Sequence, residues 1–148
     1  MTVRIHKNAL LYRAAPTVEE HPTPRVCSDT DKIGVYFAIG SPMLSETMAY
    51  EYQQDMIVSV YELVQDIDVS YGKYSYIDLN PSKYPKGYGS CRPEDNISHF
   101  DDNIQPVYPI RGQFPESCEL FLIEKDLKWV RFKGCYEYSL NKCIQDYY

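Results

Sequence analysis

The hydrophobic positions along this chain cluster in short runs that have the length and composition of β-strands. Residues 9–13 read ALLYR, and residues 33–39 read IGVYFAI, a run rich in β-branched and aromatic side chains. Residues 56–69 (MIVSVYELVQDIDV) form the longest such run, and residues 75–79 (SYIDL) form a shorter one. We expect four strands here, with residues 56–69 at the centre of a sheet.

Two further apolar runs occur late in the chain, at residues 119–124 (ELFLIE) and 128–132 (KWVRF). Only residues 125–127 separate them, and this spacing is typical of a β-hairpin. We therefore expect these two strands to pair with each other.

Helical signals are fewer. Ser41 and Pro42 follow the second predicted strand, and a capping hydroxyl before a proline predicts a helix over residues 42–53. Near the end of the chain, four residues recur at helical spacing: Leu140, Cys143, Ile144 and Tyr147. They predict a short closing helix. Because strands dominate and helices are few, the pattern predicts an α+β fold.

Two segments have the composition of loops. Residues 14–32 carry three prolines together with acidic residues, and residues 80–117 are rich in proline, glycine and polar side chains. A loop as long as residues 80–117 usually has a function or contains short structured pieces. At 148 residues the chain has the length of one domain, so we treat residues 1–148 as a single unit.

The composition narrows the classes of partner. The formal net charge of −6 argues against binding to a nucleic-acid backbone, which requires clustered lysine and arginine. Tyrosine is over-represented, with 15 residues against 5 phenylalanines and 1 tryptophan. Tyrosine joins an apolar ring to a polar tip, so this excess suits ligand clefts, contact surfaces and core edges alike.

The cysteines and histidines show no metal-binding pattern. The five cysteines lack a CxxC spacing, and His6, His21 and His99 are far apart, so we expect no metal site. Widely spaced, odd-numbered cysteines indicate reduced thiols, and no segment has the length of a membrane span. We expect a cytoplasmic protein with no membrane partner, and delivery into a host or target cell remains an alternative.

Three polar residues stand at the ends or edges of predicted strands. Arg13 ends the first strand, Tyr36 lies in the second, and Glu119 begins a late strand directly after the long loop. An arginine in such a place can bind a phosphate or a ribose, and a carboxylate can stand at the rim of a cleft. Taken alone, each residue also has an ordinary structural explanation. Arg13 could form a surface ion pair, Tyr36 could be a core ring, and Glu119 could be a charge at the end of a strand.

Arg13 and four motifs, two of which contain Tyr36 and Glu119, follow one another along the chain in an order that resembles the ADP-ribosyltransferase superfamily. The motifs are Gly34-Val35-Tyr36-Phe37-Ala38, Thr47-Met48-Ala49-Tyr50, Pro85-Lys86-Gly87-Tyr88-Gly89-Ser90, and Glu119 heading the strand ELFLI. The likeness is closest to the poly(ADP-ribose) polymerase type. RES-type toxins that degrade NAD also pair an arginine with a tyrosine, and their helical glutamate would correspond to Glu46.

The resemblance implies a split β-sandwich and cleavage of the nicotinamide–ribose bond of NAD. In that mechanism Glu119 stabilises the oxocarbenium-like transition state, and Tyr36 and Tyr50 stack on nicotinamide. Arg13 holds a phosphate or ribose group, and Thr47 bonds the carboxamide. Glu46 is the alternative acid.

The implied function is a mono-ADP-ribosyltransferase toxin or effector, because the lysine that aids chain elongation in polymerases has no clear match. An NAD glycohydrolase and a non-catalytic ADP-ribose-binding or protein-binding module are alternatives, and the motifs could also be coincidental in an interaction protein. A macromolecular ADP-ribose acceptor and an immunity or antitoxin protein are the partners that this resemblance implies beyond NAD.

Overall fold

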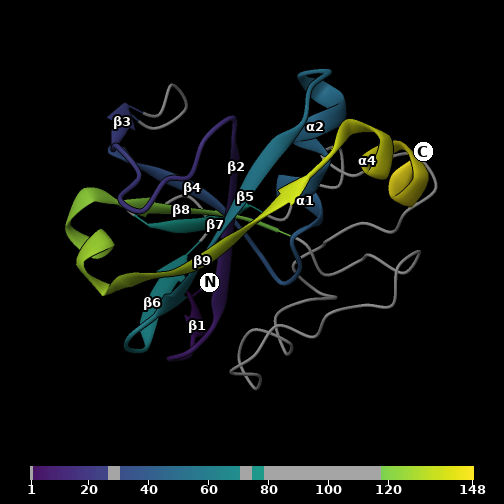
Figure 1. The fold of residues 1–148 in the computed structure, drawn as a ribbon. Helices are drawn as coiled ribbons and strands as arrows, with labels where there is room; N and C mark the ends of the chain where they lie inside the picture. The colour runs from purple at the N-terminus through teal and green to yellow at the C-terminus, as the bar shows by residue number, and fades with distance from the viewer. Residues whose placement is uncertain (1, 27–30, 71–74, 79–117) are drawn as a thin grey trace.

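The computed structural model describes residues 2–26, 31–70, 75–78 and 118–148. Within them, seven strands form one antiparallel sheet, two strands form a second small sheet, and three α-helices gather at one end (Figure 1). The predicted α+β class is therefore confirmed. The long predicted loop, with the motif Pro85–Ser90, lies outside the described residues.

The larger sheet has the strand order β7 (Tyr76–Asp78), β8 (Cys118–Ile123), β4 (Ile33–Ile39), β2 (Leu10–Ala15), β5 (Met56–Leu63) and β9 (Val130–Tyr138), and β3 (Arg25–Val26) pairs with β4. The small sheet consists of β1 (Thr2–Ile5) and β6 (Ile67–Ser70). The strands predicted at 9–13, 33–39 and 75–79 are confirmed as β2, β4 and β7, with small shifts of their ends.

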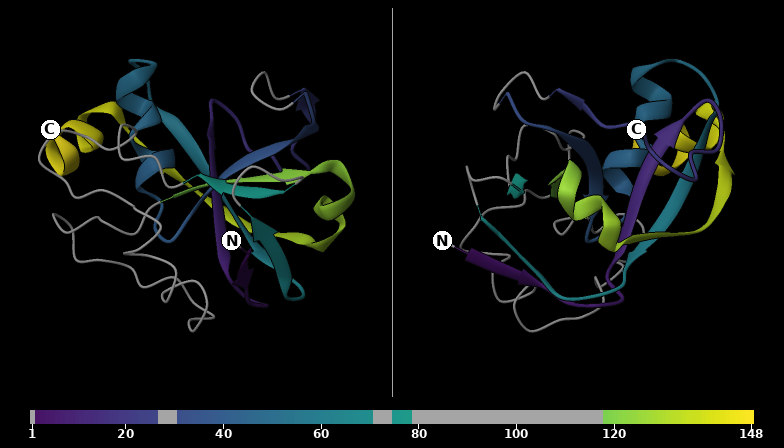
Figure 2. Two further views of the ribbon diagram at one scale, coloured as in Figure 1. Left: turned by 180° about the vertical axis from the view of Figure 1, so that it is seen from behind. Right: turned by 90° about the vertical axis from the view of Figure 1, so that its left-hand side faces the viewer.

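The large sheet divides between β2 and β4. These strands pair only at Leu11 with Ile39 and at Tyr12 with Ala38. Beyond Tyr12, β2 stays paired with β5 as far as Ala15, whereas β4 stays paired with β8. The views in Figure 1 and Figure 2 both show β2 and β4 diverging from the point where they meet.

The strand predicted over residues 56–69 is two strands in the structure, so that prediction is wrong. β5 ends at Leu63 and β6 begins at Ile67 in the other sheet. Tyr61, Leu63, Ile67 and Val69 all belong to one buried cluster. The buried positions on the two sides of the bend have the same odd–even phase, although Gln65 between them is exposed. The phase of the apolar residues therefore does not by itself separate the two strands.

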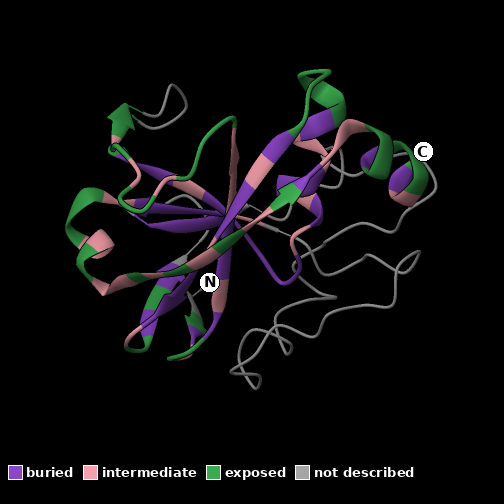
Figure 3. Cartoon of the chain, in the orientation of Figure 1, coloured by how far each residue is buried: buried purple, intermediate pink, exposed green. Residues whose placement is uncertain are grey.

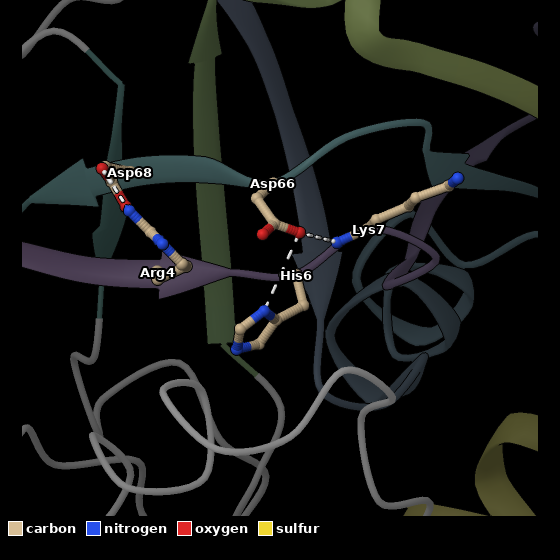
Figure 4. Close-up of polar contacts among 5 residues, drawn as sticks. All are labelled: Arg4, His6, Lys7, Asp66 and Asp68. Carbon is tan, nitrogen blue, oxygen red and sulfur yellow. Dashed lines mark hydrogen bonds and ion pairs between the residues drawn. The ribbon is translucent and has the colours of Figure 1, made fainter.

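Polar contacts fasten β6 to β1 (Figure 4). Arg4 donates to both carboxylate oxygens of Asp68, at 3.0 and 3.3 Å, and this holds the pKa of Asp68 below its ordinary value. At the other end of the pair, the Asp66 carboxylate accepts from the backbone N–H of Lys7 at 2.7 Å and lies 3.8 Å from Nδ1 of His6. These bonds close the small sheet where β5 gives way to β6.

The predicted hairpin between residues 119–124 and 128–132 is also wrong. β8 pairs with β4 and β7, whereas β9 pairs with β5 in the other half of the sheet. Leu120, Phe121 and Leu122 are all fully buried, so both faces of β8 are covered. In the strand order β8 lies between β7 and β4 and is not an edge strand. The 3₁₀ helix η2 (Glu124–Trp129) carries the chain between the halves.

The predicted helices are confirmed, the first with a break. Residues 42–53 form α1 (Met43–Glu46) and α2 (Met48–Glu51), which meet at Thr47. Pro42 is the N-cap of α1 rather than its first helical residue, so the predicted start is shifted by one residue. The Ser41 hydroxyl, one residue before the cap, accepts from the N–H of Met43 at 3.3 Å. The closing helix is α4 (Leu140–Tyr147), and the Ser139 hydroxyl caps it by accepting from the N–H of Lys142 at 3.0 Å.

Two large buried clusters stabilise the fold, and β2 and β5 contribute side chains to both of them. Figure 3 shows buried positions along the strands of the sheet and in the helices. The larger cluster joins the two sheets, because it contains Leu11 and Leu120 of the large sheet together with Ile5 and Val69 of the small one. The second packs α1, α2 and α4 on the sheet through residues such as Met43 and Tyr147. The helices are thereby fixed against one end of the split.

Gly34 has no room for a side chain. A Cβ there would overlap the carbonyl oxygen of Leu122 and lie 2.7 Å from Cζ of Phe121. We expect Gly34→Ala to lower the free energy of unfolding by about 1–3 kcal/mol, the usual range for overpacking. Gly134 is the matched control, because a Cβ there has no heavy atom within 4 Å. Urea denaturation of both variants tests this, and equal stabilities would contradict it.

Glu62 makes the stability of the fold depend on acid pH. Its hydrogen bond from Arg131 holds the pKa of Glu62 below the ordinary 4.5, although burial acts in the opposite direction. Lys133 Nζ adds an ion pair at 3.6 Å. Below pH 4.5 the unfolded state binds more protons than the native state, so this stabilisation is complete above 4.5 and is lost as the pH falls through the native pKa.

We therefore expect Glu62→Gln to weaken the decline of the urea midpoint between about pH 5 and pH 3. Glu137, an exposed glutamate on β9, provides the matched control Glu137→Gln. An unchanged decline in Glu62→Gln would contradict the assignment.

Candidate functional site

A cleft of about 460 Å³ opens where β2 and β4 separate. Residues of β2, β3, β4, β5, β8, α1 and α2 line it, together with the segments that follow β2 and α2. The cleft brings together Arg13, Tyr36 and Glu119, which the sequence analysis proposed as site residues and which lie far apart along the chain. Thr47, Tyr50 and Glu46 are not among its lining residues.

Arg13 bridges the two diverging strands. Its Nη1 donates to the backbone carbonyl of Tyr36 at 2.5 Å, and its Nε donates to the carboxylate of Glu19 at 3.1 Å. The pairing of β2 with β4 ends one residue earlier, at Tyr12. The guanidinium therefore supplies a hydrogen-bond donor to the Tyr36 carbonyl beyond the paired part of the two strands. Arg13 therefore stabilises the split, and a guanidinium has three further N–H groups beyond these two contacts.

Glu19 is held in place by three contacts from the sheet. Beside the bond from Arg13, its backbone N–H donates to the Ser59 hydroxyl at 3.1 Å, and its carbonyl accepts from the Tyr61 hydroxyl. Burial raises the pKa of Tyr61 to about 12, so the phenol keeps its proton and remains a donor. The segment after β2 thus forms a fixed wall of the cleft.

Tyr36 lies on the cleft face of β4. It pairs in register with Phe121, and the two ring centroids are 4.8 Å apart. Its hydroxyl lies 3.1 Å from the hydroxyl of Tyr76 on β7. The ring is therefore fixed at its edge and tip by neighbours in the sheet while it still lines the cleft.

Glu119 enters the cleft from β8. It is opposite Ala38, and Phe121, two residues further along β8, is opposite Tyr36. Side chains two residues apart on a strand share a face, so Glu119 and Tyr36 are diagonal neighbours at roughly 7–8 Å. A ring and a carboxylate so placed can hold a flat heterocycle and the sugar attached to it.

The predicted residues of the first helical region lie elsewhere. The Glu46 side chain is 1% exposed and accepts from the hydroxyls of Tyr136 at 2.7 Å and Tyr147 at 2.5 Å. The ring of Tyr50 stacks on that of Tyr148, with centroids 4.1 Å apart. The expected sandwich of Tyr36 and Tyr50 around one ring is therefore not formed in this structure.

Thr47 is also absent from the cleft wall, and its hydroxyl donates to the carbonyl of Leu44 at 3.4 Å. The lining residues from this region include Ser45 of α1, Met48 of α2 and Tyr52, which directly follows α2. These residues recur every three or four positions, but the sequence does not show which helical face meets β4.

Arg25 and Glu19 are the other charged residues that sequence reasoning missed. Both lie in the proline-rich segment between the first two predicted strands, which reads as a loop. The composition of a loop carries no signal for the direction in which its charges point.

Within the described residues, no three histidine, cysteine or acidic side chains are grouped so that they could bind a metal ion. In the same part of the chain, no helix combines the length and apolar character needed to cross a membrane. Comparisons with models of protein families, with curated proteins and with solved structures found no match to this chain.

Proposed function

We propose that the chain binds NAD in the cleft at the split and cleaves its nicotinamide–ribose bond. The observation that carries this proposal is the meeting of Arg13, Tyr36 and Glu119 in one cleft, in the order that resembles the ADP-ribosyltransferases. The divergence of β2 and β4 supports the split β-sandwich that this resemblance implies. Transfer of ADP-ribose to an acceptor is the favoured reaction, and hydrolysis is the alternative.

Cleavage of this bond develops positive charge on the ribose ring. A carboxylate fixed beside the ring stabilises that charge most in the transition state, which is the kind of interaction that raises a rate. Glu119 takes this role, because it lines the cleft one diagonal position from Tyr36. The Tyr36 ring stacks on the nicotinamide. Tyr52 takes the role that the sequence analysis gave to Tyr50, because Tyr52 lines the cleft from the end of α2.

The location of the two candidate acids favours Glu119 over Glu46. Glu46 lies beneath the helices, where two tyrosine hydroxyls bind its carboxylate. Its side chain is buried and is not among the lining residues of the cleft. The comparison with RES-type toxins, which assigns the acid to the helix, is therefore the weaker of the two.

The direct test is nicotinamide released from NAD by the purified protein, measured with and without a cell extract as acceptor. Release in buffer alone indicates a glycohydrolase. Release that requires the extract and labels a macromolecule with ADP-ribose indicates a transferase. Absence of release under both conditions contradicts the proposal and leaves a binding module.

A further inference from the structure

Arg25 lies on the same face of the sheet as Tyr36 and Glu119. β3 pairs with β4 so that Arg25 is opposite Gly34. Residues opposite each other in an antiparallel pair place their side chains on one face, and Gly34, Tyr36 and Ala38 share that face of β4. Arg25 also lines the cleft.

The charges of the cleft are unevenly matched. Its charged lining residues are Arg13, Glu19, Arg25 and Glu119. Arg13 and Glu19 form an ion pair with N–O distance 3.1 Å and each is about a quarter exposed, so their charges largely offset each other. Within the described part of the chain, the exposed guanidinium of Arg25 makes no hydrogen bond or ion pair, which makes it the cation of the cleft with all five donors available.

The spacing along β4 separates this cation from the carboxylate. Arg25 is opposite Gly34, and Glu119 is opposite Ala38 on the other side of the strand. Four residues of strand correspond to about 13 Å, with Tyr36 in the middle. The face therefore offers a cation at one end, an aromatic ring at the centre and a carboxylate at the other end.

We propose that Arg25 is the anion-binding residue of the cleft and holds the pyrophosphate of a dinucleotide. Arginine suits this task because its planar fork bonds two phosphate oxygens at once. The role expected for Arg13 thus passes to Arg25, because the ion pair with Glu19 offsets the charge of Arg13, and its bond to the Tyr36 carbonyl fixes its guanidinium between the strands. The choice of pyrophosphate rests on the proposed function, whereas the anion site rests on the charges of the cleft alone.

Titration of the full chain with inorganic pyrophosphate, followed by calorimetry or ³¹P NMR at one fixed ionic strength, tests the site without NAD. We expect Arg25→Gln to weaken binding by roughly tenfold or more, as expected for loss of a charge-assisted hydrogen bond, and Arg25→Lys to weaken it less. Arg4→Gln is the matched control, because Arg4 is an exposed arginine engaged with Asp68 on the small sheet. Arg25 is exposed, so its variants should fold as the native chain does.

The outcomes separate this proposal from the proposed function. Equal affinity of Arg25→Gln and the native chain, or no pyrophosphate binding by the native chain, overturns the role of Arg25 even if nicotinamide is released from NAD. Weakened binding in Arg25→Gln with no nicotinamide release by the native chain keeps the anion site and rejects NAD cleavage. An equal loss in Arg4→Gln would show a general charge effect and would also overturn the proposal.

Discussion

Glu119→Gln is expected to lower the rate of nicotinamide release from NAD by roughly a few hundredfold or more, which corresponds to about 3–4 kcal/mol of transition-state stabilisation. Glutamine keeps the size of the side chain and its hydrogen-bonding oxygen but removes the negative charge. The negative charge of the carboxylate is what stabilises the positive charge that develops on the ribose. The affinity for NAD should change much less, because the ground state of the ribose is uncharged.

Glu124→Gln is the matched control for this experiment. Glu124 follows β8 directly, is exposed, and is not among the lining residues of the cleft. Both variants should unfold at the same urea concentration as the native chain. Full activity in Glu119→Gln would contradict the catalytic assignment, and loss of activity in Glu124→Gln would show that the effect is not specific to the cleft.

Glu46→Ala is expected to lower the free energy of unfolding by about 2–4 kcal/mol. The substitution removes the acceptor of hydrogen bonds from Tyr136 and Tyr147 and leaves a cavity under α1. The Tyr147 side chain is 2% exposed, so its hydroxyl has little access to water as a replacement partner. A fall of roughly 5–15 °C in Tm, measured by circular dichroism, is the expected readout.

Two further variants make this prediction specific. Tyr147→Phe removes one of the two bonds and should cost about 1–2 kcal/mol. Glu51→Ala removes an exposed glutamate from α2 and should cost less than about 0.5 kcal/mol. If Glu46→Ala is as stable as Glu51→Ala but releases no nicotinamide, Glu46 is the catalytic acid and the assignment to Glu119 is wrong.

Much of the local structure was predictable because its signals are local. The continuous apolar, β-branched and aromatic run of residues 33–39 specifies β4, and the Ser41-Pro42 step marks the start of α1 to within one residue. The same kind of signal failed at residues 125–127, where a short connection predicted a hairpin. There both edges of β8 pair with β4 and β7, which leaves no edge for β9, and the chain crosses to the other half of the sheet instead.

The candidate site was predictable in the strands and not in the helices. Arg13, Tyr36 and Glu119 belong to strands, where alternation assigns each side chain to one of two faces. Glu46 and Tyr50 belong to short helices, where the face that meets the cleft depends on how α1 and α2 dock against the sheet and α4. That docking turned Ser45, Met48 and Tyr52 toward the cleft.

By itself, the sequence determined the α+β class, most of the strands and the positions of the helices, and it marked Arg13, Tyr36 and Glu119 as candidate site residues. The tertiary structure alone decided where the sheet splits, that Arg13 is bound to Glu19, and that Arg25 faces the cleft. The physical reason is that strand pairing and ion pairs join residues far apart in the chain. Local propensity limits each segment to a few conformations, but the burial of all segments together selects which of them meet.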